Sequence, residues 1–265
     1  MKKYFNLFIL TATLTLALNA CAKIEPGPDD KARFIASDGM IIAGKYVPPK
    51  TPDKITFILL HGLSSTKDEW NRFEAKLIER GCGYFAYDLR GHHGSSKNTD
   101  GREITINEIV NSGQISEIEK LVSDIDGAVK YLKHNGIKKE KIGLIGASIG
   151  ANISLIYASK NKFIPIVVLL SPGWNYTGLE TNTAIQQYGQ RPLGLAASPG
   201  DKYAYDTATQ MVLVGRQLKS DTAFFEGVQA QHGTQMLTDE FDSKLLNWID
   251  GNLGDVVKKS RYGLK

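Results

Sequence analysis

A serine between two glycines is the sequence pattern that most directly suggests covalent chemistry. Residues 146–150 read Gly-Ala-Ser-Ile-Gly; an apolar run at 141–145 precedes them, and a helical pattern covers 149–159. A serine on a sharp turn from strand to helix has its hydroxyl clear of the backbone. The N-terminus of the helix favours negative charge that develops beside it. The pattern therefore predicts that Ser148 is a nucleophile.

The elements that must position this serine alternate between strand and helix. After a predicted hairpin turn at 37–39, apolar runs and helical periodicities follow one another along the chain. We expect strands over 32–36, 40–47, 55–60, 84–87, 141–145, 163–170, 193–197 and 222–228, and helices over 68–80, 116–132, 149–159, 206–218 and 239–253. This alternation predicts an α/β fold with a mostly parallel sheet, whose ligand sites form at the carboxyl ends of the strands.

Two further motifs follow predicted strands. Residues 59–63 read Leu-Leu-His-Gly-Leu, and residues 87–96 read Tyr-Asp-Leu-Arg-Gly-His-His-Gly-Ser-Ser. With the serine motif, and Asp-Glu-Trp at 68–70, they resemble the α/β-hydrolase superfamily. The closest likeness is to dienelactone-hydrolase-like and lysophospholipase-like serine esterases and to related serine aminopeptidases. The resemblance covers nearly all of residues 32–254.

The resemblance implies the α/β-hydrolase fold, a mostly parallel eight-stranded sheet with helices on both faces. It also implies the chain order serine, acid, histidine, which assigns Asp201 as the acid and His232 as the base for Ser148. Asp206, which we interpret as the N-cap of the next helix, and Asp221 are the alternative acids.

An oxyanion hole of two backbone N–H groups is implied as well. These are the N–H groups of Leu63, after the first parallel strand, and of Ile149, after the nucleophile. His61 is then expected to orient its loop by hydrogen bonding. His92 and His93 stand where the family has one histidine, and we expect them to buttress the loop. We expect His134 to be a solvated surface residue in a helix-ending turn.

The interval between the predicted strands 163–170 and 193–197 is too short for a lid domain. It predicts a short flap, in which Trp174 and Tyr176 are candidate pocket residues. The alternative is that the aromatic residues there pack the loop onto the core. A short flap suggests carboxylic esters of small to medium acyl groups as substrates. A peptidase or amidase with the same triad, and an inactive binding lipoprotein, are the alternative functions.

Composition sets limits on the other classes of function. The chain has 265 residues, of which 42% are hydrophobic and 23% charged, as in a globular protein. The net charge is +4, and removal of Lys2 and Lys3 leaves +2, which does not make a nucleic-acid-binding face. Since no metal-ligand cluster or phosphate loop occurs, we expect no metal and no cofactor. The oligomeric state is not predicted.

The N-terminus has the features of an export signal. Lys2 and Lys3 precede an apolar run at 4–17, and residues 18–21 read Leu-Asn-Ala-Cys. This resembles the lipobox of bacterial lipoproteins, which implies a signal peptide over 1–20 and acylation of Cys21. The acyl chains, palmitate among them, would anchor the protein in a membrane.

The residue after the cysteine suggests which membrane. Ala22 stands where an aspartate would often signal retention in the inner membrane, so the resemblance favours the outer membrane of the cell envelope. The alternative is a plain signal peptide cut near Ala20 or Ala22, which would give a periplasmic or secreted protein.

The remaining segments complete the expected organisation. Residues 21–30 are predicted to be a tether, 31–255 the hydrolase domain and 256–265 a basic tail. The tail is expected to be solvated, with contact to a membrane surface as the alternative. Once Cys21 carries lipid, Cys82 has no disulfide partner, and we expect a buried, unreactive thiol.

Overall fold

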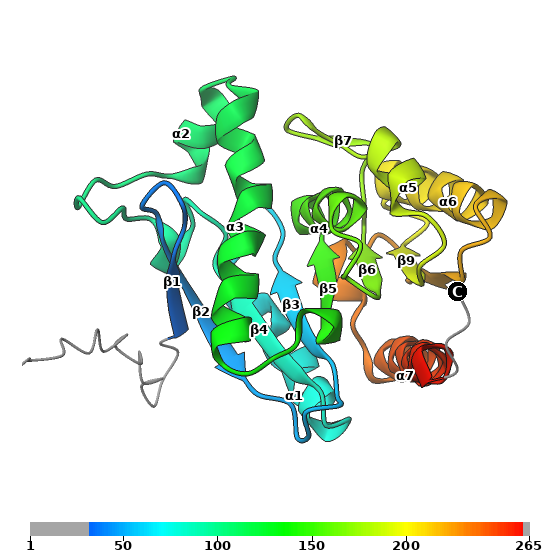
Figure 1. Ribbon diagram of the computed structural model, residues 1–265. Helices are drawn as coiled ribbons and strands as arrows, with labels where there is room; N and C mark the ends of the chain where they lie inside the picture. The colour runs from blue at the N-terminus through cyan, green and yellow to red at the C-terminus, as the bar shows by residue number, and fades with distance from the viewer. Residues whose placement is uncertain (1–31, 262–265) are drawn as a thin grey trace, which may run out of the picture.

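A central sheet of eight strands organises the part of the chain described by the computed structural model, residues 32–261, with side chains described as far as residue 253. The strands lie in the order β1-β2-β4-β3-β5-β6-β9-β10 (Figure 1). Their bounds are Ala32–Ile35 (β1), Ile41–Val47 (β2), Thr56–Leu60 (β3), Gly83–Tyr87 (β4), Ile142–Ala147 (β5), Val167–Leu170 (β6), Leu193–Ala197 (β9) and Thr222–Glu226 (β10). Only β2 runs against its neighbours. The predicted mostly parallel sheet is confirmed.

Helices connect the strands and cover the sheet. The α-helices are Asn71–Glu79 (α1), Ile106–Asn111 (α2), Ile115–His134 (α3), Ile149–Lys160 (α4), Asn182–Tyr188 (α5), Lys202–Gln217 (α6) and Asp239–Arg261 (α7). Short 3₁₀ helices are Lys67–Trp70 (η1), His93–Ser95 (η2), Lys139–Lys141 (η3) and Gly233–Met236 (η4). A separate two-stranded hairpin pairs Asn175–Tyr176 (β7) with Leu179–Glu180 (β8).

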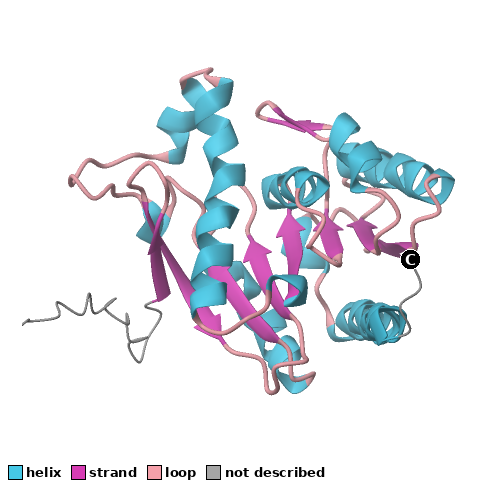
Figure 2. Ribbon diagram, in the orientation of Figure 1, coloured by secondary structure: helices cyan, strands magenta, loops and turns pink. Residues whose placement is uncertain are grey.

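Helices lie on both faces of the sheet, as Figure 2 shows. Every residue of β3, β4, β5, β6 and β9 is buried. Along β3, Ile58 and Leu60 pack in the core that α3 and α4 share, whereas Phe57 and Leu59 pack in the core of α1 and α7. This explains the continuous apolar runs, because a strand covered on both faces has no polar side.

Two elements begin four residues away from their predicted starts. The strand expected over 163–170 forms only from Val167, because Pro165 has no N–H to donate to a neighbouring strand. The helix expected from Asp206 begins at Lys202, with Asp201 at the N-cap position. Asp206 is therefore not the N-cap; it lies one turn inside α6 and pairs with Lys202 at 2.9 Å.

A short helix, α2, was not predicted, although its start has a sequence signature. The Thr105 side chain accepts the Glu108 N–H at 3.2 Å, and the Glu108 carboxylate accepts the Thr105 N–H at 2.7 Å. This reciprocal pair is a capping box, which a Thr-x-x-Glu spacing can signal. The helix places Ile106 and Ile109 against the core beside α3.

The predicted flap after β6 consists of the β7–β8 hairpin and α5, and no lid domain is seen among the described residues. Leu179, Ile185 and Tyr188 are buried in the core that contains α3 and α4. Buried Asn152 of α4 donates to the Leu179 carbonyl at 2.8 Å and accepts the Gly173 N–H at 3.0 Å. The flap is thus held to α4 by apolar packing and by one buried amide.

The membrane anchor was predicted at the N-terminus of the chain and the basic tail at its C-terminus. The predicted signal peptide over 1–20 and the predicted tether over 21–30, with Cys21, lie outside the described residues, as do residues 31 and 262–265. α7 runs to Arg261 and so includes part of the predicted tail. Within the described range, no helix has the length and apolarity needed to cross a membrane. Cys82 is a free, buried thiol whose pKa burial raises to about 11.

Candidate active site

The turn between β5 and α4 puts Ser148 in an unusual backbone conformation. Its φ of 54° and ψ of −120° lie where L-residues are rarely found. A Cβ on Gly146 would lie 2.1 Å from the Gly150 carbonyl oxygen, and one on Gly150 would lie 2.2 Å from that of Leu60. Strand and helix meet this closely only because both positions are glycine. The strained residue is the one whose hydroxyl stands at the helix N-terminus.

A histidine and an aspartate from two other loops meet beside this turn. His232 Nδ1 lies 2.6 Å from Asp201 Oδ2. Asp201 follows β9 and His232 follows β10, and the Gly200 N–H donates to the Gln229 carbonyl at 2.7 Å, which joins the two loops. Because the carboxylate accepts the Nδ1–H, the proton-accepting nitrogen of the neutral imidazole is Nε2.

The loop of His232 also lies against the strand that carries the serine. The Gly233 N–H donates to Ser171 Oγ at 2.9 Å, and a Cβ on Gly233 would lie 3.3 Å from the Ala147 Cβ. Gly233 adjoins the histidine and Ala147 adjoins the serine. The fold thus brings the three sequence-predicted residues, Ser148, Asp201 and His232, to one end of the sheet.

The alternative acids do not reach the imidazole. The carboxylate of Asp206 pairs with Lys202, and the exposed Asp221 contributes a backbone carbonyl that accepts the Leu193 N–H at 3.0 Å. Among the described carboxylates, Asp201 is the one hydrogen-bonded to His232. Its side chain is 17% exposed and that of the imidazole 42%, so the pair opens to solvent at the histidine.

The loop after β3 lies directly beside the serine. A Cβ on Gly62 would lie 3.5 Å from the Ser148 Cβ. Residues 62–65 form a turn in which the Ser65 N–H donates to the Gly62 carbonyl at 3.2 Å, with Ser64 at φ 60°. Of the backbone donors in this turn, the Leu63 N–H alone has no acceptor in the described part of the chain. Ile149, the other predicted donor, is the first residue of α4.

Two buried histidines hold the neighbouring loops. His61 Nδ1 lies 2.7 Å from the Gly62 carbonyl, and its Nε2 accepts the Leu89 N–H at 2.8 Å. His92 Nδ1 lies 3.1 Å from the Leu89 carbonyl, and its Nε2 accepts the Ser64 N–H at 3.3 Å. Both rings are therefore neutral with the proton on Nδ1. Burial lowers the pKa of His61 to about 4 and also lowers that of His92.

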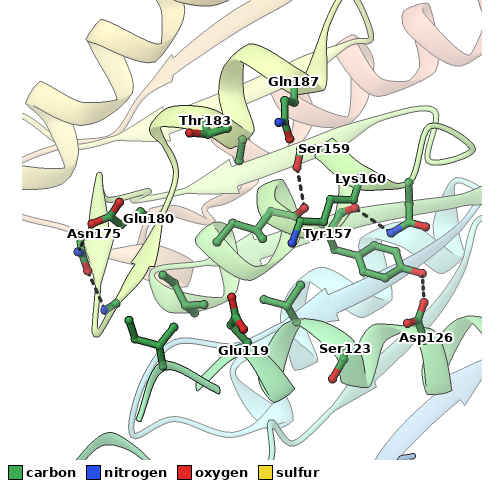
Figure 3. Close-up of a pocket in the computed structure, with 17 residues that line it drawn as sticks. Glu119, Ser123, Asp126, Tyr157, Ser159, Lys160, Asn175, Glu180, Thr183 and Gln187 are labelled. Carbon is green, nitrogen blue, oxygen red and sulfur yellow. Dashed lines mark hydrogen bonds between the residues drawn. The ribbon is translucent and has the colours of Figure 1, made fainter. Parts of the chain in front are cut away.

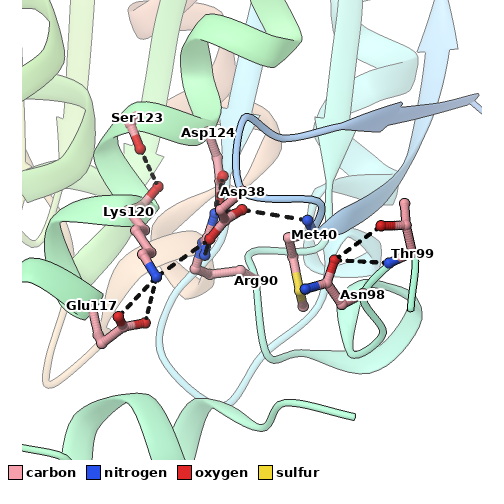
Figure 4. Close-up of polar contacts among 9 residues, drawn as sticks. All are labelled: Asp38, Met40, Arg90, Asn98, Thr99, Glu117, Lys120, Ser123 and Asp124. Atoms are coloured by element: carbon pink, nitrogen blue, oxygen red, sulfur yellow. Dashed lines mark hydrogen bonds and ion pairs between the residues drawn. The ribbon is translucent and has the colours of Figure 1, made fainter. Parts of the chain in front are cut away.

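The Asp-x-Arg part of the loop motif is also structural. Asp88 is buried and accepts both the Lys67 N–H at 2.9 Å and the Lys67 ammonium at 3.1 Å. Arg90 binds the buried Asp124 of α3 at 2.5 Å and Asp38 of the β1–β2 turn at 2.8 Å (Figure 4). Arg90 holds the pKa of Asp38 down to about 2. These ion pairs fix the β4 loop against α3.

Of the two predicted pocket residues, Tyr176 is the one that contacts the serine. Its phenol interacts with the Ser148 side chain and donates to the Ser171 carbonyl at 3.2 Å, and burial raises its pKa. Tyr203, which was not predicted, meets the Tyr176 ring edge to face at 5.7 Å and accepts the Asn175 N–H at 2.9 Å. Trp174 packs half-buried against the core of α3 and α4.

A cavity of about 880 Å³ lies elsewhere, between α3, α4, α5 and the β7–β8 hairpin (Figure 3). Polar side chains on its walls include Asp126, which accepts the Tyr157 hydroxyl at 2.8 Å. None of the three predicted catalytic residues lines it. Among the residues that the structure describes, no cluster of His, Cys, Asp or Glu is arranged to hold a metal ion.

Comparison with known proteins gives one family match. A family model described as the alpha/beta hydrolase fold matches residues 55–226. Two Xenopus laevis relatives, monoacylglycerol lipases abhd6-A and abhd6-B, are 25% and 26% identical over 112 and 124 residues. These stretches are 42% and 46% of this chain, and only 28% and 32% of the relatives, so the chain spans about a third of their length.

Solved structures share the fold at lower identity. The Pyrococcus furiosus esterase Pf2001 superimposes with a TM-score of 0.66 at 20% identity, over 84% of this chain and 91% of the esterase. A dienelactone hydrolase from Anabaena variabilis gives a TM-score of 0.60 at 17% identity, over 85% and 96%. At these identities the likeness is one of fold.

Proposed function

Because the chain belongs to the alpha/beta hydrolase fold family, we propose that it is a serine hydrolase that cleaves carboxylic esters of small to medium acyl groups. The observation that carries this proposal is the 2.6 Å contact between His232 and Asp201, on loops that converge on the strained turn of Ser148. An acid–imidazole pair beside a partly buried hydroxyl is the arrangement that activates a serine nucleophile.

The proposed reaction proceeds in two halves. His232 removes the Ser148 proton while the serine oxygen attacks the ester carbonyl, and Asp201 stabilises the imidazolium that forms. The imidazolium then protonates the departing alcohol, which leaves an acyl-serine. In the second half, His232 deprotonates a water molecule, which attacks the acyl carbon. The proton returns to Ser148, and the carboxylic acid is released.

Two backbone groups are proposed to stabilise the oxyanion of each tetrahedral intermediate. The Leu63 N–H has no acceptor in the described protein, and the Ile149 N–H lies at the start of α4, where the helix dipole adds to its effect. Each such donor contributes about 10²–10³-fold to the rate in other serine hydrolases. The pairing of one loop donor with one helix donor supports acyl transfer.

The choice of ester substrates is supported by two features. The curated relatives are named as monoacylglycerol lipases, and the aligned structures include esterases. In this chain the β7–β8 hairpin presents Tyr176 to the serine, and Leu63 and Tyr203 are 40% and 46% exposed. An open rim with apolar side chains suits short or medium acyl groups. We propose Tyr176 as a wall of the acyl pocket, with Trp174 behind it.

A panel of substrates tests the proposal. The full chain should hydrolyse p-nitrophenyl esters of graded acyl length and leave aminoacyl anilides intact, and Ser148→Ala should retain only residual turnover. Faster turnover of anilides than of esters would indicate a peptidase instead. A fluorophosphonate probe that fails to label the wild-type protein would indicate a binding lipoprotein without a working nucleophile.

We also propose that lipid on Cys21 anchors the enzyme in the cell envelope, at the outer membrane. The support is the order of a basic start, an apolar run and Leu-Asn-Ala-Cys at 18–21. Cells that express the protein should incorporate labelled palmitate into it, and Cys21→Ala should abolish the label and release the protein from membranes. Equal labelling of the variant would contradict the assignment, since Cys82 is buried.

A further inference from the structure

The turn at 62–65 needs support from outside itself. Ser64 adopts a φ of 60°, a conformation that costs a non-glycine residue about 1 kcal/mol or more. One internal hydrogen bond, from the Ser65 N–H to the Gly62 carbonyl at 3.2 Å, closes the turn. The turn nevertheless has to keep the Leu63 N–H pointed at one place, because a displacement of about 1 Å can cost a reaction 10²-fold.

Glu69 supplies that support at both ends of the turn. Its Oε1 accepts the Gly62 N–H at 3.0 Å, and its Oε2 accepts the Ser65 hydroxyl at 2.5 Å. The carboxylate therefore spans the whole turn. Glu69 belongs to η1, which the neighbouring Trp70 fixes through an indole ring that is fully buried.

The middle of the turn is held from the opposite loop. His92 Nε2 accepts the Ser64 N–H at 3.3 Å. With Glu69 on Gly62 and the internal bond on Ser65, three of the four consecutive N–H groups have protein acceptors. The fourth, the Leu63 N–H, has no acceptor among the described residues. Glu69 is also close enough to His232 for the two side chains to interact electrostatically.

We propose that Glu69 is a positioning residue for the oxyanion hole, which acts by spanning the turn from Gly62 to Ser65 so that the Leu63 N–H faces the reacting carbonyl. This inference rests on the proposed ester hydrolysis. It assigns the role to the reach of the side chain and its two acceptor sites rather than to its charge.

Three substitutions of Glu69 distinguish the effect of its side-chain length from the effect of its charge. Glu69→Gln has the same length, and its amide can accept from Gly62 and donate to Ser65. Glu69→Asp keeps the charge but is one methylene shorter and cannot span the turn. Glu69→Ala removes both contacts. Asp68→Asn is the matched control, because Asp68 is the exposed neighbour in η1 that pairs with Lys45 at 2.5 Å.

The expected result is a change in kcat with little change in KM. On p-nitrophenyl esters, Glu69→Ala and Glu69→Asp should lose about 10–100-fold in kcat, since a misplaced donor weakens only the transition state. The kcat of Glu69→Gln should stay within about fivefold of the wild-type value. The kcat of the control, Asp68→Asn, should equal the wild-type value. The proposal is overturned if the Asp variant keeps full kcat, if the Gln variant loses as much as Ala, or if only KM changes.

Hydrogen exchange of the peptide that contains residues 61–66 gives a readout that does not require turnover. Exchange there should be faster in Glu69→Asp and Glu69→Ala than in wild type and Glu69→Gln, while the peptide around α7 stays unchanged. Equal exchange in all four proteins would overturn the inference. If wild-type protein hydrolyses no ester, the proposed function fails, and the exchange data alone decide whether Glu69 holds the turn.

Discussion

The buried imidazole of His61 makes the stability of the protein depend on pH. Both ring nitrogens are used, with Nδ1 at the Gly62 carbonyl and Nε2 at the Leu89 N–H, so a second proton has no acceptor. Burial lowers the pKa from 6.5 to about 4. Between these values the unfolded chain binds a proton that the native protein does not. The free energy of unfolding should therefore fall as the pH is lowered from 6.5 towards 4.

The size of the effect follows from the difference in pKa. Each pKa unit corresponds to about 1.4 kcal/mol, so a difference of about 2.5 units gives about 3 kcal/mol. This contribution is fully present above pH 6.5 and is lost below pH 4. It is a large share of the roughly 5–15 kcal/mol of stability that a domain usually has.

Urea unfolding followed by circular dichroism between pH 4 and 7.5 measures this dependence. The comparison protein is His61→Gln, whose amide oxygen can accept the Leu89 N–H but cannot titrate. Its unfolding free energy should decline by about 3 kcal/mol less than that of wild type. Other shifted groups, such as Asp242 with a pKa raised by burial to about 6, are present in both proteins and cancel. Parallel curves for the two proteins would refute the reasoning.

Three further predictions concern other contacts. Asp201→Asn should reduce kcat by about 10⁴-fold without unfolding the protein, because an amide stabilises the wrong imidazole tautomer; ester assays at saturating substrate measure this. Gly150→Ala should yield little folded protein by circular dichroism, because its Cβ would lie 2.2 Å from the Leu60 carbonyl oxygen. Asp124→Ala leaves Arg90 buried with only Asp38, and urea unfolding should show a loss of about 3–5 kcal/mol.

Much of the sheet could be predicted because its central strands are short, almost wholly apolar and bounded by turn residues. The strand expected over 193–197 has those bounds in the structure, between Pro192 and the Ser-Pro-Gly that follows. The strand expected over 163–170 was too long because an apolar run continues through Pro165, and hydrophobicity does not record a missing N–H.

The sequence predicted where the flap lies in the chain, but not that it would form a hairpin and a helix. Its hairpin turns at Thr177 and Gly178, which both have positive φ, at 52° and 96°. Asn-Gly is the usual sequence for such a turn, so Thr-Gly gave a weak signal. Whether its apolar residues faced the site or the core could not be settled from spacing, because that depends on α4, which lies far away in the sequence. The structure buries Leu179 and Ile185 and brings Tyr176 to the serine.

Glu69 and Tyr203 were missed for a related reason. Each lies in or beside a motif that the sequence does reveal, Asp-Glu-Trp at 68–70 and the loop of Asp201. Each side chain is placed by a contact with a separate loop. The Glu69 carboxylate contacts Gly62, and the Tyr203 phenol contacts the β7–β8 hairpin. Such contacts require the loops to be positioned first, and no local periodicity encodes them.

The hydrogen bonds of the five histidines support the proposed choice of His232 as the base. The nitrogens of His61 and of His92 are engaged at both ends by backbone groups, and burial keeps both rings neutral. His93 and His134 are exposed and bind no described carboxylate. Among the described histidines, His232 alone combines a carboxylate contact at Nδ1 with partial exposure. An imidazole that a carboxylate orients through Nδ1 can use its other nitrogen to carry a proton between serine and substrate, which is the role proposed for His232.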